Sequence, residues 1–258
     1  MTVGISITTL EDLKKYPNIR VVQMFLFENN WKYKLTPDDE TIIQKSDIDF
    51  YCHSVFTTSL VKLQSLKILI DQYMAVDRLN FKGLVVHLPS EPTSKIYSVL
   101  HSFFESLSKR DIINYPVIYF EHVPKKKMAR SSYADVNQFI KALVMIKSIK
   151  DIYNDKIPVG FCVDTCHVYV SGINFSDSSV VQYYMNRIKS TNLPILVHLN
   201  DSSEALGSSL DRHAPIGTTI WCNSLEIPDK LTNEYTCILE LIDPSSSLEI
   251  LNPSVNRS

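Results

Sequence analysis

Histidine and carboxylate side chains recur in this sequence at the ends of short apolar segments. His53 closes the segment 49–54, for example, and Glu121 closes the segment 116–122. Two more candidates, Asp211 and His213, are separated by a single residue within the segment 198–217, where an extended backbone would point both side chains to the same side. The candidates are His53, His87, Glu121, Asp164, His167, His198, Asp211, His213 and Glu240.

Nitrogen and oxygen donors in such a set are suited to binding metal ions. Imidazoles and carboxylates without clustered thiolates suit Zn²⁺, with Mn²⁺ or Fe²⁺ as alternatives. Nine donors exceed one tetrahedral site, so with bridging carboxylates they could serve two or three ions. Taken singly, each histidine is explained equally well as a hydrogen-bonded residue at a strand end. Five of the seven histidines in one pattern, together with four acids, favour a metal centre, because buried charges need partners.

The apolar segments themselves predict the strands that position these residues. They are short, rich in β-branched and aromatic residues, and apolar on both faces, which is typical of buried parallel strands. The eight segments are 3–7, 20–27, 49–54, 83–88, 116–122, 159–165, 194–201 and 236–242.

Helical patterns separate most of these segments, at 63–73, 93–110, 136–146 and 176–190. The alternation predicts an α/β protein with a (β/α)8 barrel, forming a single domain over residues 1–258. Such a barrel gathers the carboxyl ends of all its strands at one face, so residues distant in sequence would converge there. The first connection is short, and residues 243–258 leave room only for a short or truncated final helix.

Composition limits the other function classes. The net charge is −2 and the pI is near 6.4, so any contact with nucleic acid must come from a local patch. The sequence shows no secretory signal and no apolar run of the roughly 20 residues that cross a bilayer. These features predict a soluble protein with no membrane partner, located inside the cell in the cytoplasm or nucleus.

The five cysteines are an odd number without the spacing of a disulfide framework, and we expect reduced thiols. Cys52, Cys162 and Cys166 lie beside candidate ligands. We expect them to pack in the core, with strand alternation turning them away from His53 and Asp164.

Two longer motifs carry a family resemblance. CVDTCHVYVSGIN (162–174) and HLNDSSEALGSSLDRHAPIG (198–217) resemble the most specific signatures of the endonuclease IV family of apurinic/apyrimidinic (AP) endonucleases. The shorter motifs YCHSVF, VVHLPS, YFEH and ILELIDP are similar to other family motifs and follow in the same order. The resemblance covers essentially the whole chain.

The resemblance implies a TIM barrel with three zinc ions that cleaves damaged double-stranded DNA. Cleavage 5′ to an abasic site would leave a 3′-hydroxyl, in base excision repair, and the enzyme would also trim blocked 3′ ends. The first zinc would be held by His53, His87 and Glu121. Glu121 would bridge to the second zinc and position the attacking water. The remaining ligands would be Asp164, His198 and Glu240 for the second zinc, and His167, Asp211 and His213 for the third. A monomer is expected.

The DNA contacts implied by the resemblance involve Phe56, Asn200 and Arg212. Phe56 would stack on a base, with core packing as the alternative, and Arg212 would reach a phosphate. The sequence departs from the family pattern in several recognition segments, where a basic residue or a glycine is usual. The departing positions include Asn29, Asn30, Ser203 and Thr219. We therefore expect an intact metal centre and an altered DNA-reading surface.

Two other functions are consistent with parts of the pattern. A metal-dependent sugar isomerase or epimerase on a related barrel would use fewer metals and sugar-binding residues. The Asp211–Arg212–His213 motif and the third ligand group argue against it. A non-catalytic DNA-binding derivative would not need all nine ligands. The AP endonuclease remains the favoured hypothesis, although a motif match alone is a hypothesis.

Overall fold

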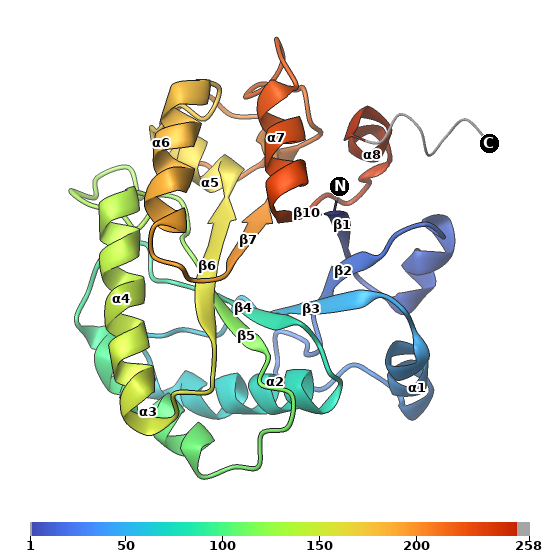
Figure 1. The fold of residues 1–258 in the computed structure, drawn as a ribbon, viewed down its shortest axis with the longest axis vertical. Helices are drawn as coiled ribbons and strands as arrows, with labels where there is room; N and C mark the ends of the chain where they lie inside the picture. Colours follow the sequence, from blue (N-terminus) through green and yellow to red (C-terminus); the bar gives the residue numbers. More distant parts are fainter. Residues whose placement is uncertain (1, 252–258) are drawn as a thin grey trace.

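The computed structural model describes residues 2–251, which form a closed parallel barrel surrounded by helices (Figure 1). The strand order around the barrel is β1-β10-β7-β6-β5-β4-β3-β2, and every neighbouring pair is parallel. The predicted (β/α)8 barrel is therefore confirmed. No described helix has the length and apolar character needed to cross a membrane.

Each predicted apolar segment contains one barrel strand. The strands are β1 (Thr2–Ile7), β2 (Val21–Met24), β3 (Asp49–His53), β4 (Gly83–His87), β5 (Val117–Glu121), β6 (Val159–Asp164), β7 (Ile195–His198) and β10 (Thr236–Leu239). A separate antiparallel ribbon pairs β8 (Asp201–Ser202) with β9 (His213–Ala214).

The helices cover the outside of the barrel and pack against its apolar outer face (Figure 1). The four helices expected from the sequence are present as α2 (Leu66–Arg78), α3 (Lys95–Ser108), α4 (Val136–Tyr153) and α6 (Ser178–Lys189). Three α-helices lie outside the ranges expected to be helical: α1 (Pro37–Lys45), α5 (Thr165–Val170) and α7 (Glu226–Glu234). The short final helix expected from the sequence is present as α8 (Ser245–Leu251).

The first connection contains only the 3-10 helix η1 (Leu10–Lys15), and a second 3-10 helix, η2 (Leu63–Ser65), precedes α2. The sequence indicates a short first connection, and in the structure its few residues form a compact 3-10 helix in place of a full α-helix.

The inside of the barrel is filled by a layer of side chains from seven strands. Its members are Val21, Tyr51, Val85, Tyr119, Cys162, Leu196 and Ile238. The ring of Tyr119 fits because Gly83, two residues before its register partner Val85 on β4, has no side chain; a Cβ atom there would lie 2.6 Å from that ring. The barrel is thus packed shut below its carboxyl end, and this layer forms the floor of the site.

Candidate metal centre

The polar residues of the site form the next inward-facing layer of the same strands. Side chains two residues apart on a strand point to the same side, so each residue of the floor predicts one residue above it. His53, for example, lies two residues after Tyr51 of the floor, and His87 lies two residues after Val85. The same spacing holds for the other five strands of the floor. The layer consists of Gln23, His53, His87, Glu121, Asp164, His198 and Glu240. Six of these seven are ligands expected from the sequence.

The first ligand group surrounds one oxygen of Glu121. His53 Nε2 lies 3.2 Å from Glu121 Oε2, and His87 Nε2 lies 3.1 Å from the same oxygen. Donor atoms of these three residues all lie within 4.8 Å of one another. His53 and Glu121 are buried and His87 is a quarter exposed, so the group opens toward solvent on the His87 side.

The second ligand group uses the other oxygen of Glu121. His198 Nδ1 lies 3.1 Å from Glu121 Oε1 and 3.1 Å from Glu240 Oε2. Glu121, Asp164, His198 and Glu240 have donor atoms within 4.8 Å of one another. Glu121 therefore faces both groups, one with each oxygen, as a bridging carboxylate would.

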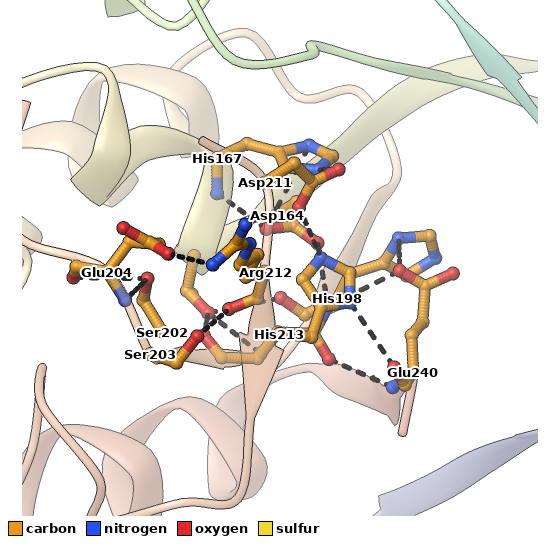
Figure 2. A network of polar contacts seen from close by, with 12 residues as sticks. Asp164, His167, His198, Ser202, Ser203, Glu204, Asp211, Arg212, His213 and Glu240 are labelled. Carbon is orange, nitrogen blue, oxygen red and sulfur yellow. Dashed lines mark hydrogen bonds and ion pairs between the residues drawn. The ribbon is translucent and has the colours of Figure 1, made fainter. Parts of the chain in front are cut away.

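The third ligand group lies beside the barrel mouth and comes from α5, from β9 and from the loop that precedes β9. His167 Nε2 is 3.1 Å from Asp211 Oδ2, and His213 Nε2 is 3.1 Å from Asp211 Oδ1. The residues converge on Asp164 (Figure 2), whose Oδ2 lies 3.5 Å from His213 Nε2. Asp164 also caps α5 by accepting a 2.7 Å hydrogen bond from the backbone N–H of His167.

Asp201, which the sequence did not single out as functional, anchors the loop next to His213. Its buried carboxylate accepts hydrogen bonds from the backbone N–H groups of Ser202 and of residues 217–220. Because β8 carries Asp201 and pairs with β9, this anchor also fixes the position of His213. Gly217, followed directly by two threonines, is the sequence feature that could have indicated a turn bound by this carboxylate.

The second ring nitrogens show how the imidazoles are oriented. Nδ1 of His53 bonds the carbonyl of Ser54 at 2.7 Å, and Nδ1 of His167 bonds that of His122 at 2.9 Å. Nδ1 of His213 bonds the carbonyl of Glu240 at 3.2 Å. A carbonyl can only accept, so each Nδ1 carries a proton, and in the neutral form of each ring the lone pair is on the Nε2 that faces the cluster. This arrangement is typical of metal-ligating histidines.

The described residues therefore fit divalent metal ions. His213 Nε2 is buried and lies 3.1 Å from Asp211 Oδ1 without the geometry of a hydrogen bond, although a buried ring nitrogen normally makes one. Five imidazoles and four carboxylates converge, and every ion pair that these four carboxylates make among the described residues is with a histidine. Hard carboxylate and borderline imidazole donors of this kind are those of zinc and related transition-metal sites.

The electrostatics of the cluster couple its acids to its histidines. Burial disfavours the charged form of Glu240, but the charge and hydrogen bond of His198 prevail and lower the pKa of Glu240 to about 2. Burial acts against a charged His213, whereas Asp164 and Asp211 raise its pKa to about 9. For Asp164 the burial effect dominates and raises its pKa. The acids and imidazoles thus hold one another in place by charge.

The two remaining histidines lie outside the ligand groups. His101 lies on α3 and bonds the hydroxyl of Tyr153 through Nδ1 at 3.1 Å. His122 is fully buried against Phe139, and burial lowers its pKa to about 3, so its ring is neutral. The five histidines that the sequence grouped together are the five that the structure brings together.

The expected orientation of the cysteines needs a correction. Cys52 does face the outer core, away from His53. Cys162, however, is two residues from Asp164 and points to the same side, where it joins the floor beneath the site and lies within 4.8 Å of donor atoms of Glu121 and His198. Cys166 likewise lies near Asp164 and His213. Burial raises the pKa of the Cys162 and Cys166 thiols far above neutral, so both remain protonated packing residues.

The three expected DNA contacts have different surroundings. Asn200 is fully buried, and its Nδ2 donates to Asp164 Oδ2 at 2.7 Å, so the expected DNA contact is wrong and the side chain supports the ligands. Phe56 is 66% exposed at the rim beside His53, which excludes the core-packing alternative. Arg212 is exposed and pairs with Glu204 at 2.9 Å, pointing away from the ligand groups (Figure 2).

Comparison with known proteins relates this architecture to a family. A probable AP endonuclease of African swine fever virus is 24% identical over 217 residues, covering 82% of this chain and 66% of the relative. A probable endonuclease 4 of Protochlamydia amoebophila is 37% identical over 84 residues, covering 31% of this chain and 28% of the relative. The chain is therefore similar, over most of its length, to a protein named as a probable AP endonuclease. It spans less than two thirds of the length of these two relatives, and no family model matches it.

Solved structures agree on the barrel fold. Endonuclease IV from Thermus thermophilus superposes with a TM-score of 0.73 at 17% identity, covering all of both chains. A D-tagatose 3-epimerase-like protein superposes with a TM-score of 0.67, also at 17% identity, covering 99% of this chain and 100% of that one. Similarity at this level shows the barrel fold alone, so the activity must be argued from the site.

Proposed function

We propose that this chain is a metal-dependent AP endonuclease that hydrolyses the phosphodiester 5′ to an abasic site in duplex DNA and leaves a 3′-hydroxyl. The observation that carries the proposal is the position of Glu121, whose two oxygens face two separate ligand groups 3.1–3.2 Å away. A third group lies alongside at Asp164. Three adjacent cation sites match a reaction in which a phosphate gains and redistributes negative charge.

The ligand groups support three zinc ions, with Mn²⁺ or Fe²⁺ as an alternative at one site. His53, His87 and Glu121 would hold the first ion, and Glu121, Asp164, His198 and Glu240 the second. His167, Asp211 and His213 would hold the third, next to Asp164. Bound divalent ions supply Lewis acidity, a lowered pKa for water and compensation of phosphate charge.

Residues of the protein orient the ligands of this centre and exclude solvent from one side of it. Glu121 is fully buried between four histidines, so its carboxylate has a fixed direction toward both groups. Asn200 donates to Asp164 and receives the backbone N–H of Glu240 at 2.9 Å, which locks two ligand strands together. The packed floor beneath the layer closes the barrel to solvent from below. Chemistry is thus confined to the open carboxyl-terminal face.

The open face supports duplex DNA as the partner. Phe56 lies in the cleft that is lined by His53, His87, Glu121 and His213, where its exposed ring can stack on a base. Arg212 lies between two ligands and can turn from Glu204 to a phosphate. We further propose 3′-end trimming at the same centre, action as a monomer, and a location inside the cell wherever the DNA is.

A sugar isomerase or epimerase is the second candidate, because the epimerase-like neighbour has the same barrel. The third ligand group argues against it. His213 lies on β9 and Asp211 in the loop before it, both outside the barrel ring, and a mononuclear sugar site would not need them.

Cleavage of a duplex oligonucleotide with one tetrahydrofuran abasic analogue tests the proposal. The wild type, Glu121→Gln and the control Glu105→Gln, an exposed acid on α3, are compared, with metal content measured by elemental analysis on the same samples. We expect cleavage 5′ to the lesion with close to three zinc ions per chain, lost in Glu121→Gln and kept in the control. Bound zinc with epimerisation of a ketose and no cleavage would favour the second candidate. A wild type with neither zinc nor cleavage would contradict the metal centre.

A further inference from the structure

Gln23 is the member of the polar layer that has no proposed ligand role. It lies on β2, two residues after Val21 of the floor, and its side chain is fully buried among the ligands. Burying a carboxamide costs free energy unless its donor and acceptor are both satisfied. Its contacts therefore indicate what it does.

The carboxamide bridges two ligands of the second group. Gln23 Nε2 donates to Glu240 Oε1 at 2.7 Å, and Gln23 Oε1 lies 2.9 Å from His198 Nε2. An ionised carboxylate can only accept, so the amide nitrogen must face Glu240 and the amide oxygen must face His198. Nε2 of His198 consequently carries the proton.

This assignment leaves Nδ1 of His198 as the atom that faces the cluster. Nδ1 lies 3.1 Å from Glu121 Oε1 and 3.1 Å from Glu240 Oε2, between the oxygens of the second group. The orientation is opposite to that of His53, His167 and His213, which face the cluster through Nε2. Those three are oriented by backbone carbonyls, whereas His198 is oriented by a side chain.

We propose that Gln23 is a positioning residue that fixes the tautomer of His198 and the direction of Glu240, and thereby sets the affinity of the second metal site. The proposal rests on the metal centre of the proposed function and assigns that centre a partner outside its ligands. Removing such a partner typically weakens metal binding by about 10- to 100-fold.

The test compares Gln23→Met with Gln72→Met. Gln72 is also fully buried, but it lies on α2 and bonds the backbone N–H of Val55 and the hydroxyl of Thr58, with no hydrogen bond to any of the nine ligands. Both substitutions remove a buried carboxamide of the same size. Zinc affinity is measured by competition with a chromophoric chelator, with thermal melts showing that each variant is folded.

We expect Gln23→Met to bind one zinc ion about 10- to 100-fold more weakly while the other ions are retained, and Gln72→Met to keep the wild-type zinc affinities. In the zinc-loaded wild type, ¹H–¹⁵N correlation of the histidine rings should show one of the five clustered histidines protonated at Nε2, and this signal should shift or be lost in Gln23→Met. Should Gln23→Met fail to fold, Gln23→Asn, whose amide is one methylene short of both partners, replaces it.

The outcomes separate the two proposals. A wild type that binds three zinc ions together with unchanged affinity in Gln23→Met would overturn the role of Gln23 and leave the proposed function standing. Equal weakening in both variants would reduce Gln23 to general packing and overturn the role as well. A wild type that binds no zinc would overturn the metal centre and this role with it.

Discussion

Oε1 of Glu121 lies 3.1 Å from Nδ1 of His198, while the second oxygen of the same carboxylate faces the His53 and His87 rings. One side chain at the end of β5 therefore connects two ligand groups that come from opposite parts of the barrel wall. The length of this side chain determines whether both groups can be reached at once.

Shortening Glu121 to aspartate should uncouple the two groups. Glu121→Asp keeps the charge but withdraws the carboxylate by one methylene, and a displacement of about 1 Å can reduce a rate by about 100-fold. We expect at least that loss in abasic-site cleavage, measured under single-turnover conditions, with fewer than three zinc ions bound. A variant with full zinc content and an unchanged rate would show that the bridge is not required.

Replacing Asp201 with asparagine should destabilise the loop that carries His213. The carboxylate accepts backbone N–H groups of Ser202 and of residues 217–220, and an asparagine would turn an N–H₂ donor toward some of them. Hydrogen bonds to a charged group contribute about 1.5–3 kcal/mol, and we expect a loss of about that size in urea unfolding.

A chemically similar acid provides the control for Asp201. Asp135 caps α4 by accepting from the backbone N–H groups of Asn137 and Gln138, away from the ligands. Asp135→Asn should cost about 1 kcal/mol or less, because asparagine also caps helices, and should leave zinc binding unchanged. Asp201→Asn should in addition weaken the third zinc, and equal zinc affinities in the two variants would disprove the link to His213.

The sequence predicted, for a physical reason, which histidines and acids come together. Parallel strands in a barrel must end at one face, so histidines and acids at successive strand ends were bound to meet there. His53 and Glu121, 68 positions apart in the chain, illustrate this, since the structure brings their side chains to 3.2 Å. No knowledge of side-chain conformation was needed for that step.

Residues whose role depends on burial were predicted less well. The sequence does not predict a role for Gln23, because a single amide in an apolar strand does not indicate a site until the inward face of β2 is known. Its spacing of two from the floor residue Val21 was the available clue. Asn200 was assigned to DNA because the sequence does not show that its side chain is closed off by Asp164 and Glu240. The predicted orientation of Cys162 is wrong because Cys162 and Asp164 are two residues apart on one strand and therefore point to the same side.

Removing the exposed ring of Phe56 should affect DNA binding without affecting stability. Surface substitutions usually change the free energy of unfolding by less than about 0.5 kcal/mol, whereas loss of an aromatic stacking partner costs about 1–3 kcal/mol of binding. We expect Phe56→Ala to weaken binding to abasic duplex by about 1–3 kcal/mol. Binding is measured by fluorescence anisotropy in the presence of a metal chelator, which prevents cleavage. Ile152→Ala, a similarly exposed apolar residue on α4, is the control and should bind as the wild type does.

The ion pair of Glu40 and Arg78 should contribute stability that depends on pH. Hydrogen bonds from Arg78 and Tyr33 lower the pKa of Glu40 from 4.5 to about 2. Since the folded pKa is below the unfolded value, the contribution is complete above about pH 4.5 and is lost as the pH falls toward 2. Screening at this partly exposed site reduces it to about 1 kcal/mol. Glu40→Gln should therefore be less stable than the wild type at pH 7 and should approach it near pH 2, measured by urea unfolding.

Arg212 offers a test of the DNA face that separates charge from structure. The side chain is 67% exposed and pairs with Glu204, so it can leave that partner for a phosphate at little cost. Each phosphate contact lowers log K by about 0.9 for every tenfold rise in salt. We expect Arg212→Gln to reduce the slope of log K against log salt by about 1, and to weaken binding to intact and abasic duplex alike.

Lys109 provides the control. It directly follows α3, on the opposite face of the barrel, and Lys109→Gln should leave the slope unchanged. Glu204→Gln frees Arg212 from its partner and should strengthen binding at low salt, and an unchanged slope in Arg212→Gln would show that this arginine does not contact the DNA backbone.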